Sequence, residues 1–143
     1  MHNQPLTHGS APFINAMTVD VEDYFQVSAF EEYVDRAQWQ TWPLRVQDNT
    51  LRILDLFAAH QVRGTFFTLG WVAERYPDLV KRIVSGGHEI ASHGWDHVRV
   101  NTQTPAEFRK DIERTRKLLQ DISGEPVLGY RAASYSIGAS EAW

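Results

Sequence analysis

Short apolar runs alternate with amphipathic helical segments along most of this chain of 143 residues. The runs have the apolar or β-prone character of strands buried on both faces, and they cover residues 13–21, 64–70, 88–92 and 127–131. The helical segments place apolar residues every three or four positions, and they cover residues 48–60, 71–85 and 105–123. Strands joined through single helices pair in parallel with right-handed crossovers. The alternation therefore predicts an α/β fold with a parallel sheet.

Helix boundary signals support this assignment. Thr104 and Glu107 form a capping box with Pro105 at the first helical position, and Gly124 follows the last turn. Pro77 is expected to divide the second helical segment into two pieces. The segment from residue 24 to 46 is irregular and aromatic, and its length is typical of a functional loop.

Composition limits the classes of function. The formal net charge of -4 does not favour binding to nucleic acid or to an anionic membrane surface. No apolar run approaches the roughly 20 residues that cross a bilayer, and no signal peptide is recognisable, so a cytoplasmic location is expected. The chain has no cysteine, and any metal ion would therefore have to be bound by histidine and carboxylate.

The chain length suggests a single domain. Residues 1–12 are polar and are expected to form a disordered leader, in which His2 and His8 are poor candidates for ligands. The expected domain covers residues 13–143. The sequence does not predict its oligomeric state.

Three groups of polar side chains follow the ends of expected strands. Asp20, Glu22 and Asp23 lie at the end of the first strand. His93 and His97 follow the third strand, and Arg131 ends the fourth. In parallel α/β folds, functional residues gather at the carboxyl ends of the strands. The coincidence predicts a functional site at this rim of the sheet.

The residue types fit a metal centre. His93 and His97 are four residues apart, and a helical turn there would point both imidazoles at one ion. Two imidazoles and one carboxylate form a common catalytic set for Zn²⁺. Strand alternation favours Glu22 over Asp23 as the carboxylate ligand, but the strand ends there and both stay candidates. Asp20 is the candidate general base, oriented by Arg131.

Each signal is weak by itself. A His-x₃-His pair occurs by chance, the acidic cluster could be a solvated helix start, and Arg131 could form a structural ion pair. Trp95 is equally compatible with a sugar platform and with a core residue. His60 and His88 have no recognisable partners and are expected to be structural.

The combined motifs resemble the polysaccharide deacetylases of the NodB-homology type, carbohydrate esterase family 4. The residues that carry the resemblance are Thr18-Val19-Asp20-Val21-Glu22-Asp23-Tyr24-Phe25, Gly64-Thr65-Phe66-Phe67, Gly87-His88-Glu89-Ile90-Ala91-Ser92-His93-Gly94-Trp95-Asp96-His97 and Gly129-Tyr130-Arg131. The first motif is similar to the branch associated with exosortase and exopolysaccharide gene clusters.

The resemblance implies the N-terminal part of a distorted (β/α)7–8 barrel and a divalent metal, most often zinc. It also implies hydrolysis of N-acetyl groups on an amino-sugar polymer during exopolysaccharide biosynthesis. By position, Asp20 matches the catalytic base and Arg131 the residue that orients it. His93 and His97 match the metal histidines, and Glu22 or Asp23 matches the metal carboxylate.

Two departures from the family pattern are visible. Ala133 stands where the family has a proline, and a more flexible loop there could misplace a backbone N–H that stabilises the oxyanion. The family's later motifs, including a general-acid histidine, would follow Trp143, so weak or no deacetylase activity is expected of this chain alone. The alternatives are a cyclic imide or ureide amidohydrolase of the same superfamily and an inactive half-barrel that binds a glycan or a partner chain.

Overall fold

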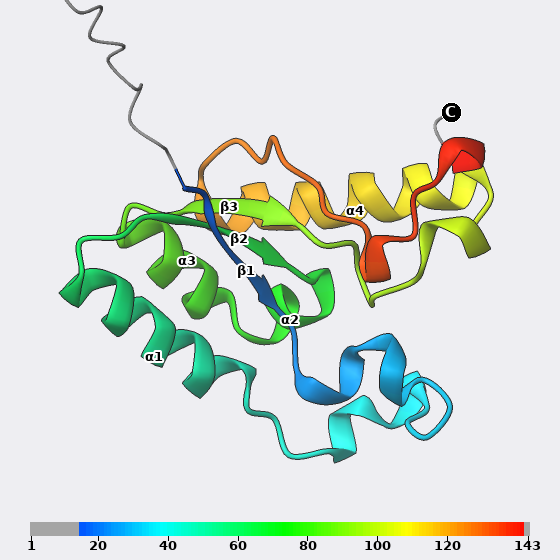
Figure 1. The fold of residues 1–143 in the computed structure, drawn as a ribbon, viewed down its shortest axis with the longest axis horizontal. Helices are drawn as coiled ribbons and strands as arrows, with labels where there is room; N and C mark the ends of the chain where they lie inside the picture. The colour runs from blue at the N-terminus through cyan, green and yellow to red at the C-terminus, as the bar shows by residue number, and fades with distance from the viewer. Residues whose placement is uncertain (1–14, 142–143) are drawn as a thin grey trace, which may run out of the picture.

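The computed structural model describes residues 15–141 and contains a parallel sheet of three strands in the order β1-β2-β3. The strands are β1 Met17–Val21, β2 Gly64–Thr68 and β3 Glu89–Ser92 (Figure 1). Val21 pairs with Thr68, and Thr68 pairs with Ser92. All three strands therefore end at the same level, and the residues that follow them share one rim.

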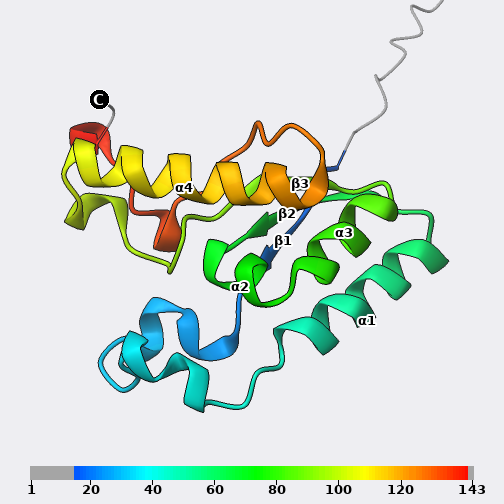
Figure 2. The same ribbon diagram turned by 180° about the vertical axis from the view of Figure 1, so that it is seen from behind.

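Three of the four helices lie side by side on one face of the sheet (Figures 1 and 2). These are α1 Val46–Ala59, α3 Pro77–Ser85 and α4 Pro105–Ser123. The short helix α2 Gly70–Arg75 follows β2 at the rim and contacts both α3 and α4. The α/β fold with parallel strands is confirmed.

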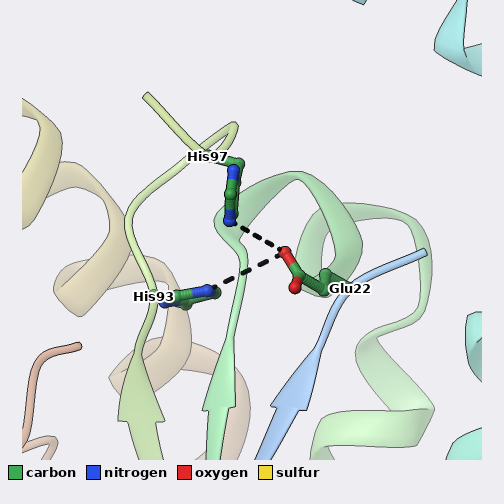
Figure 3. Close-up of side chains that lie close together, drawn as sticks. All are labelled: Glu22, His93 and His97. Carbon is green, nitrogen blue, oxygen red and sulfur yellow. Dashed lines mark ion pairs between the residues drawn. The ribbon is translucent and has the colours of Figure 1, made fainter. Parts of the chain in front are cut away.

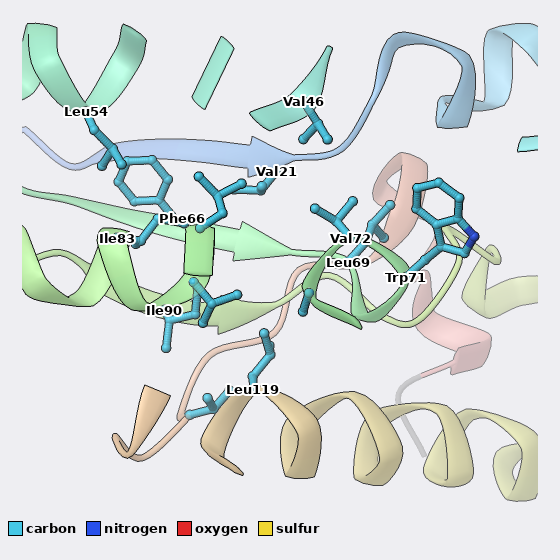
Figure 4. Close-up of a cluster of buried hydrophobic side chains, with 14 of the residues drawn as sticks. Val21, Val46, Leu54, Phe66, Leu69, Trp71, Val72, Ile83, Ile90 and Leu119 are labelled. Atoms are coloured by element: carbon cyan, nitrogen blue, oxygen red, sulfur yellow. The ribbon is translucent and has the colours of Figure 1, made fainter. Parts of the chain in front are cut away.

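The core lies between the sheet and these helices (Figure 4). Val21, Phe66 and Ile90 supply it from the three strands, and each is at most 2% exposed. The helices supply Leu54, Val72, Ile83 and Leu119. Burying a side chain of this size stabilises the fold by roughly 1.5–3 kcal/mol. This packing holds the three strands in the register that aligns their ends.

Two helix predictions are confirmed. The second helical segment divides at Pro77, which opens α3 as its first residue. Helix α4 has the reciprocal Thr104–Glu107 capping box, and Gly124 ends it with a left-handed φ of 73°. Helix α1 begins at Val46, ahead of the expected cap at Asp48 or Asn49, because the carboxylate of the distant Asp23 accepts hydrogen bonds from Arg45 N and Val46 N.

The expected fourth strand at 127–131 is wrong. Only a single parallel bridge forms there, between Ser92 and Tyr130. Side chains of α4 take the polar groups that a longer ladder would use: Gln120 accepts from Val127 N, and Arg116 donates to Val127 O. Arg131 still reaches the rim, because its N–H donates to Ser92 O at 2.9 Å.

The aromatic segment between β1 and α1 folds into three short 3₁₀ turns. These are η1 Tyr24–Gln26, η2 Ser28–Phe30 and η3 Arg36–Thr41. Phe25 and Trp39 are buried, and the Trp39 ring lies 5.5 Å from the Trp71 ring of α2. The segment is therefore packed against the rim of the sheet.

The N-terminal leader with His2 and His8 lies outside the described residues, as do Phe13 and Ile14 of the first expected strand and the C-terminal Trp143. Among the described helices, none is long and apolar enough to cross a membrane.

Candidate metal centre and active site

Glu22, His93 and His97 meet at the rim of the sheet (Figure 3). Glu22 Oε2 lies 3.2 Å from His97 Nε2 and 3.8 Å from His93 Nε2. Within residues 15–141, this is the one group of three potential ligands whose atoms all lie within 4.8 Å of one another.

The parallel register places two of the three residues. Glu22 follows Val21, and His93 follows Ser92. Val21 and Ser92 both align with Thr68 of β2. His97 arrives through a loop that turns at Gly94, where φ is 79°. The expected helical turn between the histidines does not form; His97 itself adopts a left-handed φ of 58°.

Both imidazoles are neutral, and the His93 ring is in the tautomer that can bind a cation through Nε2. His93 Nδ1 lies 2.8 Å from the carbonyl oxygen of Arg131. A carbonyl only accepts, so Nδ1 carries the proton and Nε2 keeps its lone pair. Burial lowers the pKa of His93, and burial together with the neighbouring His93 lowers the pKa of His97 to about 4. Both rings are therefore neutral at pH 7.

Among the residues that the structure describes, none donates a hydrogen bond to the buried Oε2 atom of Glu22. Burial, with a smaller contribution from Asp20, raises the pKa of Glu22 to about 7. A buried acceptor oxygen beside two neutral imidazoles fits a divalent cation, which would supply the missing positive charge. These three residues are suited to hold the metal that the sequence implied.

Asp23 is turned away from this group. Its Oδ1 accepts from Tyr24 N at 3.0 Å, and its Oδ2 accepts from Arg45 N at 2.7 Å and Val46 N at 3.0 Å. The side chain is 1% exposed. Of the two carboxylates that the sequence left open, Glu22 faces the histidines and Asp23 caps α1.

Asp20 and Arg131 form an ion pair beside the histidines. Arg131 Nη1 donates to Asp20 Oδ1 at 2.5 Å, and Arg131 Nη2 donates to Thr18 Oγ1 at 2.9 Å. The guanidinium also lies over the ring of Phe67, 4.0 Å from its centroid. The arginine is thus held at three points and presents Asp20 in a defined orientation.

An open cavity of about 150 Å³ joins these two groups. Asp20, Glu22, His93, His97 and Arg131 line it, and Val27, Ala132, Ser134 and Tyr135 complete its wall. A cavity of this kind can hold a small acyl group between the candidate base and the candidate metal ligands. The structure therefore brings together all the predicted site residues except Asp23.

Comparison with known proteins decides the family. Residues 34–140 match the polysaccharide deacetylase family, and this range contains His93, His97 and Arg131. The chain belongs to the polysaccharide deacetylase family.

Individual deacetylases resemble the chain in sequence and in fold. A peptidoglycan-N-acetylglucosamine deacetylase of Bacillus cereus is 39% identical over 75 residues, which cover 52% of this chain and 27% of that protein. A chitooligosaccharide deacetylase of Bradyrhizobium is 28% identical over 85 residues, which cover 59% of this chain and 39% of that protein. The crystal structure of the Bc1960 peptidoglycan N-acetylglucosamine deacetylase matches 88% of this chain with a TM-score of 0.67 and 28% identity.

The chain spans only part of these deacetylases. It covers less than two fifths of each of the two curated relatives and 49% of the Bc1960 chain.

The loop after Arg131 contains functional candidates that the sequence did not single out. Ser134 and Tyr135 both have positive φ, at 51° and 53°, although neither is glycine. The hydroxyl groups of Ser28 and Ser134 are 2.5 Å apart, so the loop is tied to the aromatic segment. Ala133, at the family's proline position, is buried, and its carbonyl accepts a hydrogen bond from Ser136 Oγ. Local sequence offers no signal for this conformation.

The remaining candidates of the sequence are structural. The Trp95 ring lies under the guanidinium of Arg114, 3.1 Å from the ring centroid, and it also packs against Gly70. This places Trp95 in the packing between α2 and α4 and argues against a sugar platform. His88 is buried and its Nδ1 accepts from Gly64 N at 3.2 Å, whereas His60 is exposed at the end of α1.

Proposed function

We propose that this chain carries the metal and base half of an N-deacetylase site that hydrolyses acetamide groups on an amino-sugar polymer. Glu22, His93 and His97 would hold a divalent ion. The observation that carries the proposal is the buried, unpaired Oε2 of Glu22 facing two neutral imidazoles. The family membership supports the same chemistry.

Zinc is the ion that we propose. Two imidazole nitrogens and one carboxylate oxygen are a frequent zinc set, and the chain offers no thiolate. When bound, such an ion supplies Lewis-acid activation of water and of the acetyl carbonyl. The burial of both histidines and of Glu22 Oε2 strengthens both effects.

The chain's own residues would handle the proton and the substrate. Asp20 lines the same cavity as the three ligands and would accept the proton of the attacking water. Arg131 orients Asp20 through Oδ1 and leaves Oδ2 for that proton. The strained loop at Ser134 and Tyr135 borders the cavity, where a backbone N–H would stabilise the developing oxyanion.

The substrate that we propose is a polymer of N-acetylated hexosamine, because the relatives named above act on peptidoglycan and chitooligosaccharides. A role in exopolysaccharide biosynthesis rests on the resemblance of the Asp20–Phe25 motif to that branch, and is proposed on that ground alone.

Acetate release from N-acetylglucosamine oligomers tests the proposal. We expect the weak release by this chain to require a divalent ion and to be lost in Asp20→Asn, with the metal content unchanged. Asp55→Asn is the matched control, since Asp55 is exposed on α1 and away from the site. The same release by Asp20→Asn and by the unmodified chain would contradict the assignment of the base.

Two further outcomes separate the alternatives. Hydrolysis of cyclic imides or ureides in preference to acetamides would favour the amidohydrolase reading. If Glu22→Gln and His93→Ala leave the metal content unchanged, the metal centre itself is wrong and the binding half-barrel becomes the better description.

A further inference from the structure

The loop between the two metal histidines is held by segments from three distant parts of the chain. Gly94 O and Trp95 O accept hydrogen bonds from the backbone N–H groups of Gly70 and Trp71, each at 2.9 Å. These are first-turn donors of α2, which have no acceptor within their own helix. The loop thus rests on the start of α2.

Asp111 of α4 holds the N–H side of the loop. Both of its carboxylate oxygens lie within hydrogen-bond distance of Trp95 N, at 3.0 and 3.3 Å. The approach is close, because a Cβ on Gly94 would lie 2.9 Å from Asp111 Oδ2. A carboxylate accepts more strongly than a neutral group, so this contact defines the path of the loop.

Arg36 of η3 holds the carbonyl side of the same loop. Its Nε donates to Asp96 O at 3.1 Å, and its Nη2 lies 3.4 Å from His97 O. Glu31 Oε1 lies 3.3 Å from Arg36 Nη2 and orients this guanidinium. Glu31 also forms an ion pair with Arg99. Arg36 therefore connects the aromatic segment to the backbone of the second metal histidine.

The conformation of His97 explains why such contacts are needed. A left-handed φ is unfavourable for a histidine and persists only where the surroundings impose it. Neither Arg36 nor Asp111 lines the cavity of the candidate site. Both contact the site through the backbone of the loop, and the charge of Arg36 also contributes, after burial and His93, to the lowered pKa of His97.

We propose that Asp111 and Arg36 are positioning residues of the metal centre. They hold the N–H side and the C=O side of residues 94–97 and so keep Nε2 of His97 beside Glu22. The inference rests on the proposed metal-binding function. It adds two charged residues from outside the histidine motif that set the geometry of the motif.

Amide hydrogen exchange of the metal-free chain tests the holding of the loop directly. We expect residues 94–98 to exchange at least about tenfold faster in Arg36→Ala and in Asp111→Ala. Asp111→Asn keeps one acceptor oxygen and should restore most of the protection. Arg75→Ala is the matched control, since Arg75 also bonds a backbone carbonyl and covers a tryptophan ring, but on α2.

Zinc affinity, measured by competition with a chromogenic chelator, tests the consequence. We expect Arg36→Ala and Asp111→Ala to bind zinc about 10- to 100-fold more weakly, and Arg75→Ala to bind within about twofold of the unmodified chain. The absorption spectrum of the Co²⁺ form should change in the first two variants and not in the control.

The outcomes separate this inference from the proposed function. Unchanged loop exchange, or a zinc affinity that falls equally in Arg75→Ala, would overturn the positioning role. If the unmodified chain binds no divalent ion at all, the proposed metal centre is wrong. The positioning role is then wrong as well, even where hydrogen exchange shows that Arg36 and Asp111 hold the loop.

Discussion

Oε2 of the buried Glu22 lies 3.8 Å from Nε2 of His93, and both atoms are acceptors once Glu22 is ionised, because Nδ1 of His93 carries the proton of that ring. Two lone pairs at this distance repel unless a proton or a cation lies between them. The buried position keeps water from relieving that repulsion. The contact therefore favours binding of a cation at this rim of the sheet.

Glu22→Gln should stabilise the metal-free fold and weaken metal binding. The folded protein raises the pKa of Glu22 to about 7, so at pH 8 the ionised group destabilises the metal-free fold. We expect the metal-free variant to gain about 1–3 kcal/mol in free energy of unfolding at pH 8 and to lose most of its zinc affinity. Denaturant unfolding in chelator and a zinc titration measure the two effects. A metal-free variant less stable than the unmodified chain would contradict the account of Glu22.

Asp23→Asn should destabilise the fold and leave metal binding nearly unchanged. Its carboxylate accepts three backbone N–H groups and caps α1 from a distance, and an asparagine cannot serve all three. We expect a loss of about 2–4 kcal/mol in unfolding free energy, with zinc affinity nearly unchanged in the folded fraction. Urea unfolding checks the first value. Asp48→Asn, an exposed change in the first turn of α1, is the control.

Arg131→Lys should impair turnover and spare the metal. A lysine cannot bond Asp20 and Thr18 simultaneously in the forked geometry of the guanidinium. The contact of Arg131 to His93 is made by the backbone carbonyl, which the substitution retains. We expect kcat for acetate release to fall about 10- to 100-fold while zinc affinity stays within about twofold. Equal losses of both would show that the arginine side chain supports the metal ligands.

The stability of the metal-free protein should carry a pH dependence from Asp111. Burial raises the pKa of Asp111 from 3.8 to about 6. The group binds its proton more tightly in the folded state, so its contribution is fully present below about pH 4 and is lost as pH rises through about 6. Urea unfolding between pH 4 and pH 7 should show a smaller decline in Asp111→Asn than in the unmodified chain. A parallel decline in both proteins would assign the pH dependence to other groups.

Most secondary structure could be predicted from the sequence because it depends on local signals. The Thr104–Glu107 capping box and Pro77 act within one turn, and both helices obey them. The failures have distant causes. Asp23 moves the start of α1 to Val46, and the side chains of Gln120 and Arg116 take the backbone groups of Val127 that a fourth strand would use.

The sequence alone determined that the chain forms a parallel α/β sheet and that Asp20, His93, His97 and Arg131 gather at one rim. Strand periodicity and the rule that parallel strands end together are sufficient for Asp20 and the histidines, whereas Arg131 reaches the rim through a single bridge instead of the expected strand. Only the tertiary structure decided that Glu22, not Asp23, faces the histidines. It also decided that the histidine loop is held by Arg36 and Asp111. Both outcomes depend on contacts between residues far apart in the chain, which no local pattern encodes.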